Sequence, residues 1–341
     1  MTSGSLKRNI VAAIVLLHAL AHASVGMWTF SDGNVWVVEP LWGVAMVGYF
    51  AAAFGIMGMP LLRRRWKEIL VVSTFASMLL LLVAATDLSM IGISIDVAVL
   101  VIALVWESDE IDAELTQGEA VSRRIHRHPL LQRVSWIVAG LFLLHAGVVV
   151  LLRPVYLQWG TTPDERVATL PGDELAPNAR YRIDHAITIH APANAVWPWI
   201  AQLGQDRGGF YSYDWLERLI GDDIHNADRI HPEWQQRQPG DFVRATQPDY
   251  LGGRFGALGW SVVDVVPERA LILRDWGAFV VQPVNDTTSR LIVRTRGAGQ
   301  PNMVSLLAGP LTVFVFEPAH FMMQRAMLQG IRDRAEHAAR S

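Results

Sequence analysis

The sequence predicts an all-α membrane bundle of about five spans, followed by an α+β domain. Three observations predict this fold class. Of the 341 residues, 51% are hydrophobic and only 18% are charged, whereas about a quarter of the residues in a soluble globular protein carry a charge. Before residue 153, the charges form short clusters between long apolar runs. After residue 153, turn-forming residues appear, and apolar and polar residues begin to alternate.

Five apolar runs in the first part have the length of a membrane-crossing helix. They cover residues 10–29, 40–62, 69–85, 88–106 and 134–152. A helix needs about 20 residues to cross about 30 Å of hydrocarbon. The third and fourth runs are joined by a tight turn around Asp87. We therefore predict a four-span membrane module at residues 1–107, a polar cytoplasmic connector at 108–133 and a fifth transmembrane helix at 134–152.

The basic residues of the first part predict an orientation. They precede the first run, follow the second, and lie between the fourth and the fifth, while the other two loops contain none. The positive-inside rule therefore predicts a cytoplasmic N-terminus and an extracytoplasmic C-terminal domain. A signal peptide cleaved near Ala23 is an alternative that leaves this topology unchanged. Because only Lys7 and Lys67 are lysines among 29 basic residues, we expect a GC-rich genome and a bacterial cell membrane.

Composition also excludes several classes of function. The chain has no cysteine, which rules out disulfides, a thiol nucleophile and metal centres held by thiolates. The formal net charge is −3, and a balance this close to neutral argues against nucleic acid as a partner. The apolar runs predict instead that the chain interacts with the membrane bilayer.

The second part has the pattern of a mixed domain. A turn-rich linker is predicted at residues 153–180, and an alternating run at 181–190 predicts a strand. Helices are predicted at 193–203, 213–220 and 317–339, and further strands at 241–246, 260–266, 270–276, 279–284 and 290–296. This order predicts an α+β helix-grip, in which an antiparallel sheet wraps the last helix and leaves a cavity between them. The apolar stretch 303–316 is predicted either as the buried start of that helix or as a segment that enters the membrane.

Four segments of the second part carry a family resemblance. They are ITIHAPANAVWPWI from Ile187, GGFYSYDWLERLIGDDIHNADRIHPEWQ from Gly208, PGDFV from Pro239 and EPAHFMMQRAMLQGIRDRAE from Glu317. With these segments, residues 181–341 resemble the SRPBCC superfamily, which includes START/Bet v 1-like and polyketide cyclase-like domains. The resemblance implies a helix-grip fold around an apolar or amphipathic small molecule, lipid or polyketide-like. Because the superfamily holds lipid carriers, cyclases and ligand sensors, it does not imply one activity.

The resemblance directs attention to residues near the expected cavity. Ligand-binding candidates are Tyr211, Trp215, Glu217, Arg274 and Trp276. Catalytic candidates are Tyr213, Asp214 and His225, since a tyrosine beside a carboxylate is able to act as an acid and base. The alternatives are that Tyr211 and Trp215 pack in the core, that Asp214 caps a helix, and that Arg274 points outward in a salt bridge.

Histidines provide the candidates for metal binding. His18 and His22 are four residues apart on one predicted helix, and Asp96 and His145 lie in other predicted spans. Ionisable residues inside a membrane are costly and indicate a functional site, although such residues also form hydrogen bonds between packed helices. His225 and His231 lie in an acidic loop that is either a chelating site or a hydrogen-bonded loop. No spacing matches a specific metal motif, and we expect no cofactor.

Three functions follow from these patterns. The leading hypothesis is membrane-anchored binding of an apolar or amphipathic small molecule in the helix-grip cavity. The second is a cyclase- or hydrolase-like enzyme that uses the tyrosine, aspartate and histidine at the cavity mouth. The third is a sensor or scaffold protein in which the membrane helices carry out the function.

Overall fold

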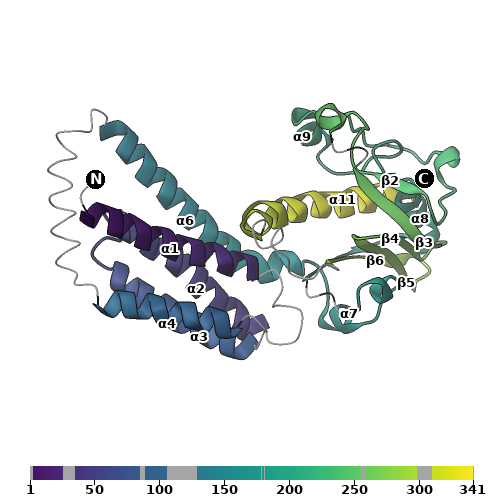
Figure 1. The fold of residues 1–341 in the computed structure, drawn as a ribbon. Coiled ribbons are helices and arrows are strands. Elements are labelled where there is room, and N and C mark those ends of the chain that lie inside the picture. Colours follow the sequence, from purple (N-terminus) through teal and green to yellow (C-terminus); the bar gives the residue numbers. More distant parts are fainter. Residues whose placement is uncertain are drawn as a thin grey trace. The chain divides into compact units, whose positions relative to one another are not determined.

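The computed structural model describes residues 3–25, 35–84, 89–105, 129–177, 179, 181–254, 256, 258–297 and 309–340. The chain divides into two compact units. The helical unit comprises Met1–Pro154 and Pro301–Phe316, and the α+β unit comprises Val155–Gln300 and Glu317–Ser341. This division confirms the predicted order of helices followed by an α+β domain (Figure 1).

The described part of the helical unit contains five long helices. They are α1 (Ser3–Val25), α2 (Val35–Ile56), α3 (Trp66–Ala84), α4 (Ser89–Val105) and α6 (Pro129–Leu157). Three segments are long and apolar enough to cross a membrane, namely Val37–Ile56, Trp66–Val83 and Arg133–Leu157. Arg8–Ala23 and Gly92–Val101 are apolar but shorter. The turn predicted around Asp87 and the predicted connector up to residue 128 lie outside the described residues.

Close packing joins these helices. Helix α2 contacts both α1 and α3, and α3 contacts α4. Gly48 of α2 lies directly against α3, because a Cβ at this position would be 2.0 Å from Ser73 Oγ. A buried ion pair joins α6 to α2, with Arg153 Nη1 donating to Glu39 Oε1 over 2.9 Å.

A short segment from late in the chain also belongs to the helical unit. Val313 and Phe314 are buried in the turn Thr312–Phe316 (η4). The Phe314 ring packs against those of Phe50 and Phe142, and its carbonyl oxygen lies 2.9 Å from His145 Nε2. The described end of the 303–316 stretch therefore packs with α2 and α6, because its aromatic side chains have partners there.

The α+β unit is built on one antiparallel sheet. Its strands are β1 (Tyr181–Ile189), β2 (Phe242–Arg244), β3 (Gly259–Val266), β4 (Ala270–Leu273), β5 (Gly277–Asn285) and β6 (Thr288–Gly297), in the order β1-β6-β5-β4-β3-β2. All six predicted strands are confirmed. The prediction for 270–276 is wrong in its last three residues, because the chain turns there with Asp275 at a φ of 59°.

Helices α8 (Ala193–Ala201) and α11 (Glu317–Ala338) pack on one face of the sheet. The core between them includes Ile187, Ile189 and Val293 from the strands and Leu328 and Ile331 from α11. A shorter helix, α9 (Asp214–Leu219), and the turns η2 (Pro232–Trp234) and η3 (Tyr250–Gly253) lie in the long connection around β2. Gly330 allows α11 to approach this connection, since a Cβ there would be 2.3 Å from the Tyr211 carbonyl oxygen.

The opposite face of the sheet is covered by the segment predicted as a linker. This segment forms α7 (Pro163–Val167) and the turn η1 (Asp173–Leu175), and Figure 1 shows α7 and α11 on opposite sides of the sheet. Leu170 packs with Ile272 and Ile292 in a second core. The segment also borders the edge strand β1, where the Ala186 amide donates to the Trp159 carbonyl over 3.0 Å. Most of the predicted linker is thus part of the folded domain.

Candidate ligand site inside the α+β unit

Polar side chains interrupt the buried stripe of α11. The buried residues of this helix are Glu317, Gln324, Met327, Leu328, Ile331 and Ala335. Their spacing of three, four or seven residues places them on one helix face. Glu317 and Gln324 therefore point toward the sheet together with the apolar residues. His320 is three residues after Glu317 and four residues before Gln324, so it lies on the same helix face. Its ring is close to that of His185 on β1.

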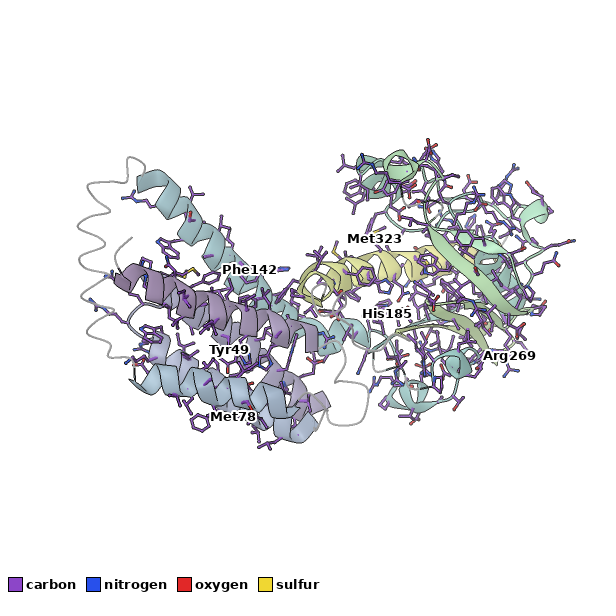
Figure 2. The ribbon with its side chains drawn as sticks, viewed as in Figure 1. Tyr49, Met78, Phe142, His185, Arg269 and Met323 are labelled. Atoms are coloured by element: carbon purple, nitrogen blue, oxygen red, sulfur yellow. The ribbon has the colours of Figure 1, made fainter. Side chains whose placement is uncertain are left out.

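His185 is the sheet's contribution to this polar group. It is fully buried on the same face of β1 as Ile187 and Ile189, and Figure 2 shows it on the side of the sheet that α11 covers. Its Nε2 lies 2.6 Å from the carbonyl oxygen of Tyr156. Because a carbonyl only accepts, Nε2 carries the hydrogen and Nδ1 keeps a lone pair. This Nδ1 is buried and has no hydrogen-bond partner among the described residues.

Gln324 and His320 face His185 from α11. The two imidazole rings are 6.2 Å apart between centroids. The Gln324 side chain is buried, and neither its amide oxygen nor its amide nitrogen has a hydrogen-bond partner of ordinary geometry among the described residues. Buried polar groups without partners are uncommon in native proteins, and each one needs a physical reason.

Aromatic rings surround these polar atoms. The Phe321 ring is 5.7 Å from that of His185, and the Trp276 ring is 6.4 Å from that of His320. Trp159 contacts both His185 and Phe321. The Tyr156 hydroxyl donates to Glu317 Oε2 over 3.0 Å. Two imidazoles and one amide thus lie in an otherwise apolar interior.

Burial keeps both imidazoles neutral. It lowers the pKa of His320 to about 3, the neighbouring His185 lowers it further, and the Gln324 amide opposes the shift. Burial also lowers the pKa of His185, against the opposing effect of the Tyr156 carbonyl. At neutral pH the site therefore offers a lone pair on His185 and an uncharged donor and acceptor on Gln324.

The residues predicted from the sequence fall into two groups. Tyr211 is buried in the core beside Trp199, and Trp276 packs against the same core and stacks on Phe279. Trp215 is exposed, and so is Arg274, which does not line the interior.

Acidic residues gather around α9. Asp214 forms a 2.9 Å ion pair with Arg218. Glu217 is half-buried, and burial raises its pKa to about 7, with smaller contributions from Asp222 and Asp214. Tyr213 precedes this helix and is exposed. The carboxyl of Glu217 on α9 thus has a raised pKa.

The two histidines of the acidic loop form separate local pairs. His225 is exposed, and its Nε2 lies 3.0 Å from Asp223 Oδ1. His231 stacks on Trp234, and its Nδ1 lies 3.1 Å from Glu233 Oε1. Among the described residues, these two histidines do not come together in a group that is able to hold a metal ion.

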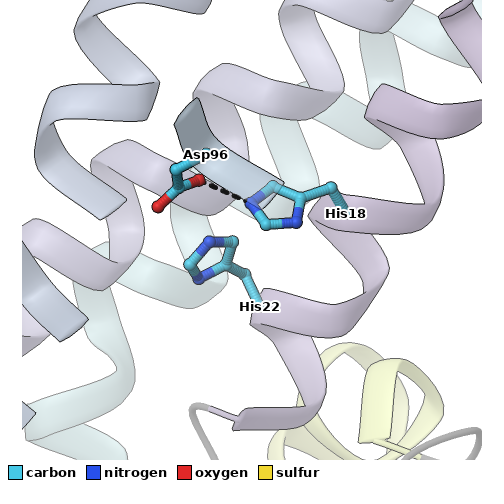
Figure 3. Close-up of side chains that lie close together, drawn as sticks. All are labelled: His18, His22 and Asp96. Atoms are coloured by element: carbon cyan, nitrogen blue, oxygen red, sulfur yellow. Dashed lines mark hydrogen bonds and ion pairs between the residues drawn. The ribbon is translucent and has the colours of Figure 1, made fainter. Parts of the chain in front are cut away.

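His18 and His22, in contrast, do come together with a carboxylate. Figure 3 shows both rings beside Asp96 in the helical unit, with His18 Nε2 lying 2.8 Å from Asp96 Oδ1. One ligating atom from each of the three residues lies within 4.8 Å of the others. The sequence identified the two histidines by their spacing and Asp96 as a possible partner, and the fold brings all three together.

Sequence reasoning missed His185, His320 and Gln324, although a signal was present. His185 occupies an inward position in the alternation Ile183, His185, Ile187, and Gln324 continues the apolar stripe of α11. Polar residues at positions that periodicity assigns to the core are the signal for such a site. In comparisons with protein-family models, curated proteins and solved structures, the chain matches none of them.

Proposed function

We propose that the α+β unit binds an uncharged, mostly apolar small molecule that carries a hydroxyl or carbonyl group. The observation that carries the proposal is the buried Gln324 amide, which has no hydrogen-bond partner of ordinary geometry beside the open Nδ1 of His185. A buried amide left without partners costs about 1–3 kcal/mol. A ligand that hydrogen-bonds to it offsets this cost when it binds.

The surrounding groups support an uncharged ligand. Aromatic rings dominate the lining, and ligand sites typically combine such a lining with a few polar groups that fix orientation. The neutral imidazoles supply no positive charge to offset an anionic group, and the Glu317 carboxyl lies at the same end of α11. A hydroxyl group on the ligand would bond to both polar residues, because it would donate to His185 Nδ1 and accept from the Gln324 amide nitrogen. The resemblance to the SRPBCC superfamily favours the same class of ligand.

We propose further that the helical unit anchors this domain in a bacterial membrane. In this arrangement α1 and α4 cross the bilayer together with α2, α3 and α6, the N-terminus is cytoplasmic, and the α+β unit is extracytoplasmic. The apolar helices and the one-sided distribution of basic residues support this topology. A reporter that is active only outside the cytoplasm, fused after Ser341, is expected to be active, and an inactive reporter on a stably produced fusion contradicts the orientation.

Extraction of bound molecules tests the ligand proposal. The full chain is purified in a mild detergent, and the small molecules that co-purify are identified by mass spectrometry. The variant Gln324→Leu removes the amide at similar size. The matched control is Met327→Leu, which changes an apolar residue of the same stripe and keeps every polar atom.

The two variants give opposite expected results. The wild type and Met327→Leu are expected to retain an uncharged hydroxyl or carbonyl compound. Gln324→Leu is expected to bind it about fivefold more weakly, because losing one hydrogen bond costs about 1 kcal/mol. Lipids that merely surround the helices appear equally in all three samples. The proposal is wrong if the wild type yields only such lipids, or if Gln324→Leu retains as much of the compound as the wild type.

A further inference from the structure

A second polar group lies in the helical unit and has no part in the proposed function. This bundle cluster consists of His18 and His22 on α1, Tyr49 on α2, Thr74 and Ser77 on α3, and Asp96 on α4. Four helices thus supply one set of interacting polar side chains. Exposure is 7% for His18, 4% for His22 and 0% for Asp96. Burying so many polar groups among apolar helices is costly and indicates a function.

The cluster is held in place by the helices. His18 and His22 are four residues apart, which places both rings on one face of α1, with 4.9 Å between their centroids. Trp42 Nε1 donates to the His22 carbonyl over 2.7 Å and ties α1 to α2. On α3, the Thr74 hydroxyl donates to the carbonyl of Leu70, and its oxygen lies 3.2 Å from the Tyr49 hydroxyl oxygen.

The hydrogen bonds around His22 determine which of its ring nitrogens carries the hydrogen. Ser77 donates its single hydrogen to Asp96 Oδ2 over 2.6 Å. The Ser77 oxygen therefore accepts from His22 Nε2, which lies 2.8 Å away. Consequently Nδ1 of His22 keeps a lone pair, and this buried atom has no partner among the described residues. Moving the hydrogen to Nδ1 frees Nε2 as a ligand atom that faces Asp96.

Asp96 is the centre of the cluster. Its Oδ1 accepts from the Tyr49 hydroxyl over 2.7 Å and lies 2.8 Å from His18 Nε2, while Oδ2 accepts from Ser77. A carboxylate that is oriented by neighbouring hydroxyls resembles the arrangement around bound metals, where groups behind the ligands fix their positions. The cluster contains no lysine or arginine. A bound cation would supply the positive charge that the residues of the cluster do not.

We propose that His18, His22 and Asp96 bind one divalent transition-metal ion of the Zn²⁺ class. Two imidazole nitrogens and one carboxylate oxygen are a ligand set that Zn²⁺ and similar ions accept, with a further position for water or a hydroxyl. The ligating atoms lie within 4.8 Å of one another. In a tetrahedral site with bonds of about 2.0–2.1 Å they would be about 3.3 Å apart. Binding therefore requires the His22 ring to move inward, which breaks the Ser77–His22 hydrogen bond. It also requires His18 Nε2 and Asp96 Oδ1, which are 2.8 Å apart, to separate slightly so that the ion lies between them.

Titration with Zn²⁺ alone tests the proposal. The full chain is purified without a histidine tag, stripped with a chelator and titrated by calorimetry in detergent. The background carries His225→Gln and His231→Gln, because these two histidines lie beside carboxylates near the surface. One Zn²⁺ per chain is expected, with affinity at least about 100-fold weaker in His22→Gln and Asp96→Asn and about 10-fold weaker in Ser77→Ala.

The matched control is His145→Gln. This histidine also belongs to the helical unit, but its Nε2 contacts the Phe314 carbonyl, outside the bundle cluster. It is expected to bind Zn²⁺ like the background protein. Absence of binding in that protein, or unchanged binding in Asp96→Asn, overturns the proposal.

A spectrum of the unmutated cluster gives a result that does not depend on variant folding. Co²⁺ shows intense visible absorption when it is four-coordinate, as it would be with two imidazoles, one carboxylate and one further ligand. The weak spectrum of six-coordinate, water-bound Co²⁺ contradicts the site even if the variants unfold.

Discussion

The helical unit and the α+β unit place their polar and apolar side chains in opposite ways. In the helical unit, large apolar side chains such as Leu17, Leu82 and Leu151 are 65%, 66% and 76% exposed, while the bundle cluster is buried. In the α+β unit, two apolar cores lie between the sheet and the segments that cover its faces. Exposed apolar side chains occur there too, such as Val167 at 83% and Leu219 at 74%. A surface of exposed leucines suits lipid and not water. The difference supports the assignment of the two units to different surroundings.

Buried polar groups also differ in how completely they are hydrogen-bonded, and the α+β unit contains both kinds. Arg294 makes five hydrogen bonds under α7, to the carboxylates of Asp184 and Asp173 and to three backbone carbonyls. A guanidinium has five N–H donors, so the donor set is used completely. The lone pair of His22 and the Gln324 amide are left open. Completely bonded groups stabilise the fold, whereas open ones are available to a ligand.

The largest expected effect is on the completely bonded group. Arg294→Met removes a buried charge and leaves Asp184 and Asp173 each with one charged partner among the described residues, Arg182 and Arg296. We expect the free energy of unfolding of the α+β unit to fall by about 3 kcal/mol, measured by denaturant titration of the full chain. Arg332→Met, which removes an exposed pair with Asp333, is the control, with an expected loss of about 0.5 kcal/mol or less. Equal losses would show that the Arg294 pairs contribute no more than surface pairs.

A smaller effect is expected for the corresponding change in the helical unit. Asp96→Asn keeps the size of the side chain and removes the charge that accepts from Tyr49 and Ser77. Since polar contacts between membrane helices average about 0.6 kcal/mol each, we expect metal-stripped protein to lose about 1–2 kcal/mol. Thermal unfolding in detergent measures this loss. A loss as large as that of Arg294→Met would remove the contrast between the two units.

The smallest expected effect concerns the half-buried carboxyl on α9. Burial raises the pKa of Glu217 to about 7 from its ordinary value of 4.5, so the folded state holds this proton more tightly than the unfolded state. Wild-type stability therefore falls as the pH rises from about 4.5 to 7. Glu217→Gln does not titrate, and we expect it to be more stable than the wild type at pH 8, with a difference that shrinks toward pH 4.5. A difference in melting temperature that does not change with pH would contradict the shift.

Local patterns in the sequence predicted the elements but not their partners. Alternation predicted β1, and the apolar stripe predicted α11, because both depend on neighbours a few residues apart. The pairing of His185 with His320, and of His18 with Asp96, depends on chain segments far apart in sequence, which periodicity does not report. The predicted place of Arg274 on a strand was wrong because the left-handed conformation of Asp275 ends β4 one residue earlier.

The segment before β1 shows the same limit. Its glycines, prolines and acidic residues predicted a linker, and these residues do form turns. The capping box of α7, in which Thr162 and Glu165 bond to each other's backbone amides, is a local signal that the composition concealed. Glu165 also reaches Arg290 on β6, and Arg294 reaches the backbone of the segment. These distant contacts convert a turn-rich stretch into a cover for the sheet.

The same segment has a consequence for contacts between copies of the chain. Strand β1 is a nine-residue edge of the sheet, and long free edges invite pairing with another chain. Here Trp159 occupies the Ala186 amide, and Gly160 passes so close to the Ala186 carbonyl that no side chain fits between them. A strand from another copy of the chain is therefore unable to pair with the middle of β1. The covered edge therefore protects the chain against aggregation by strand addition.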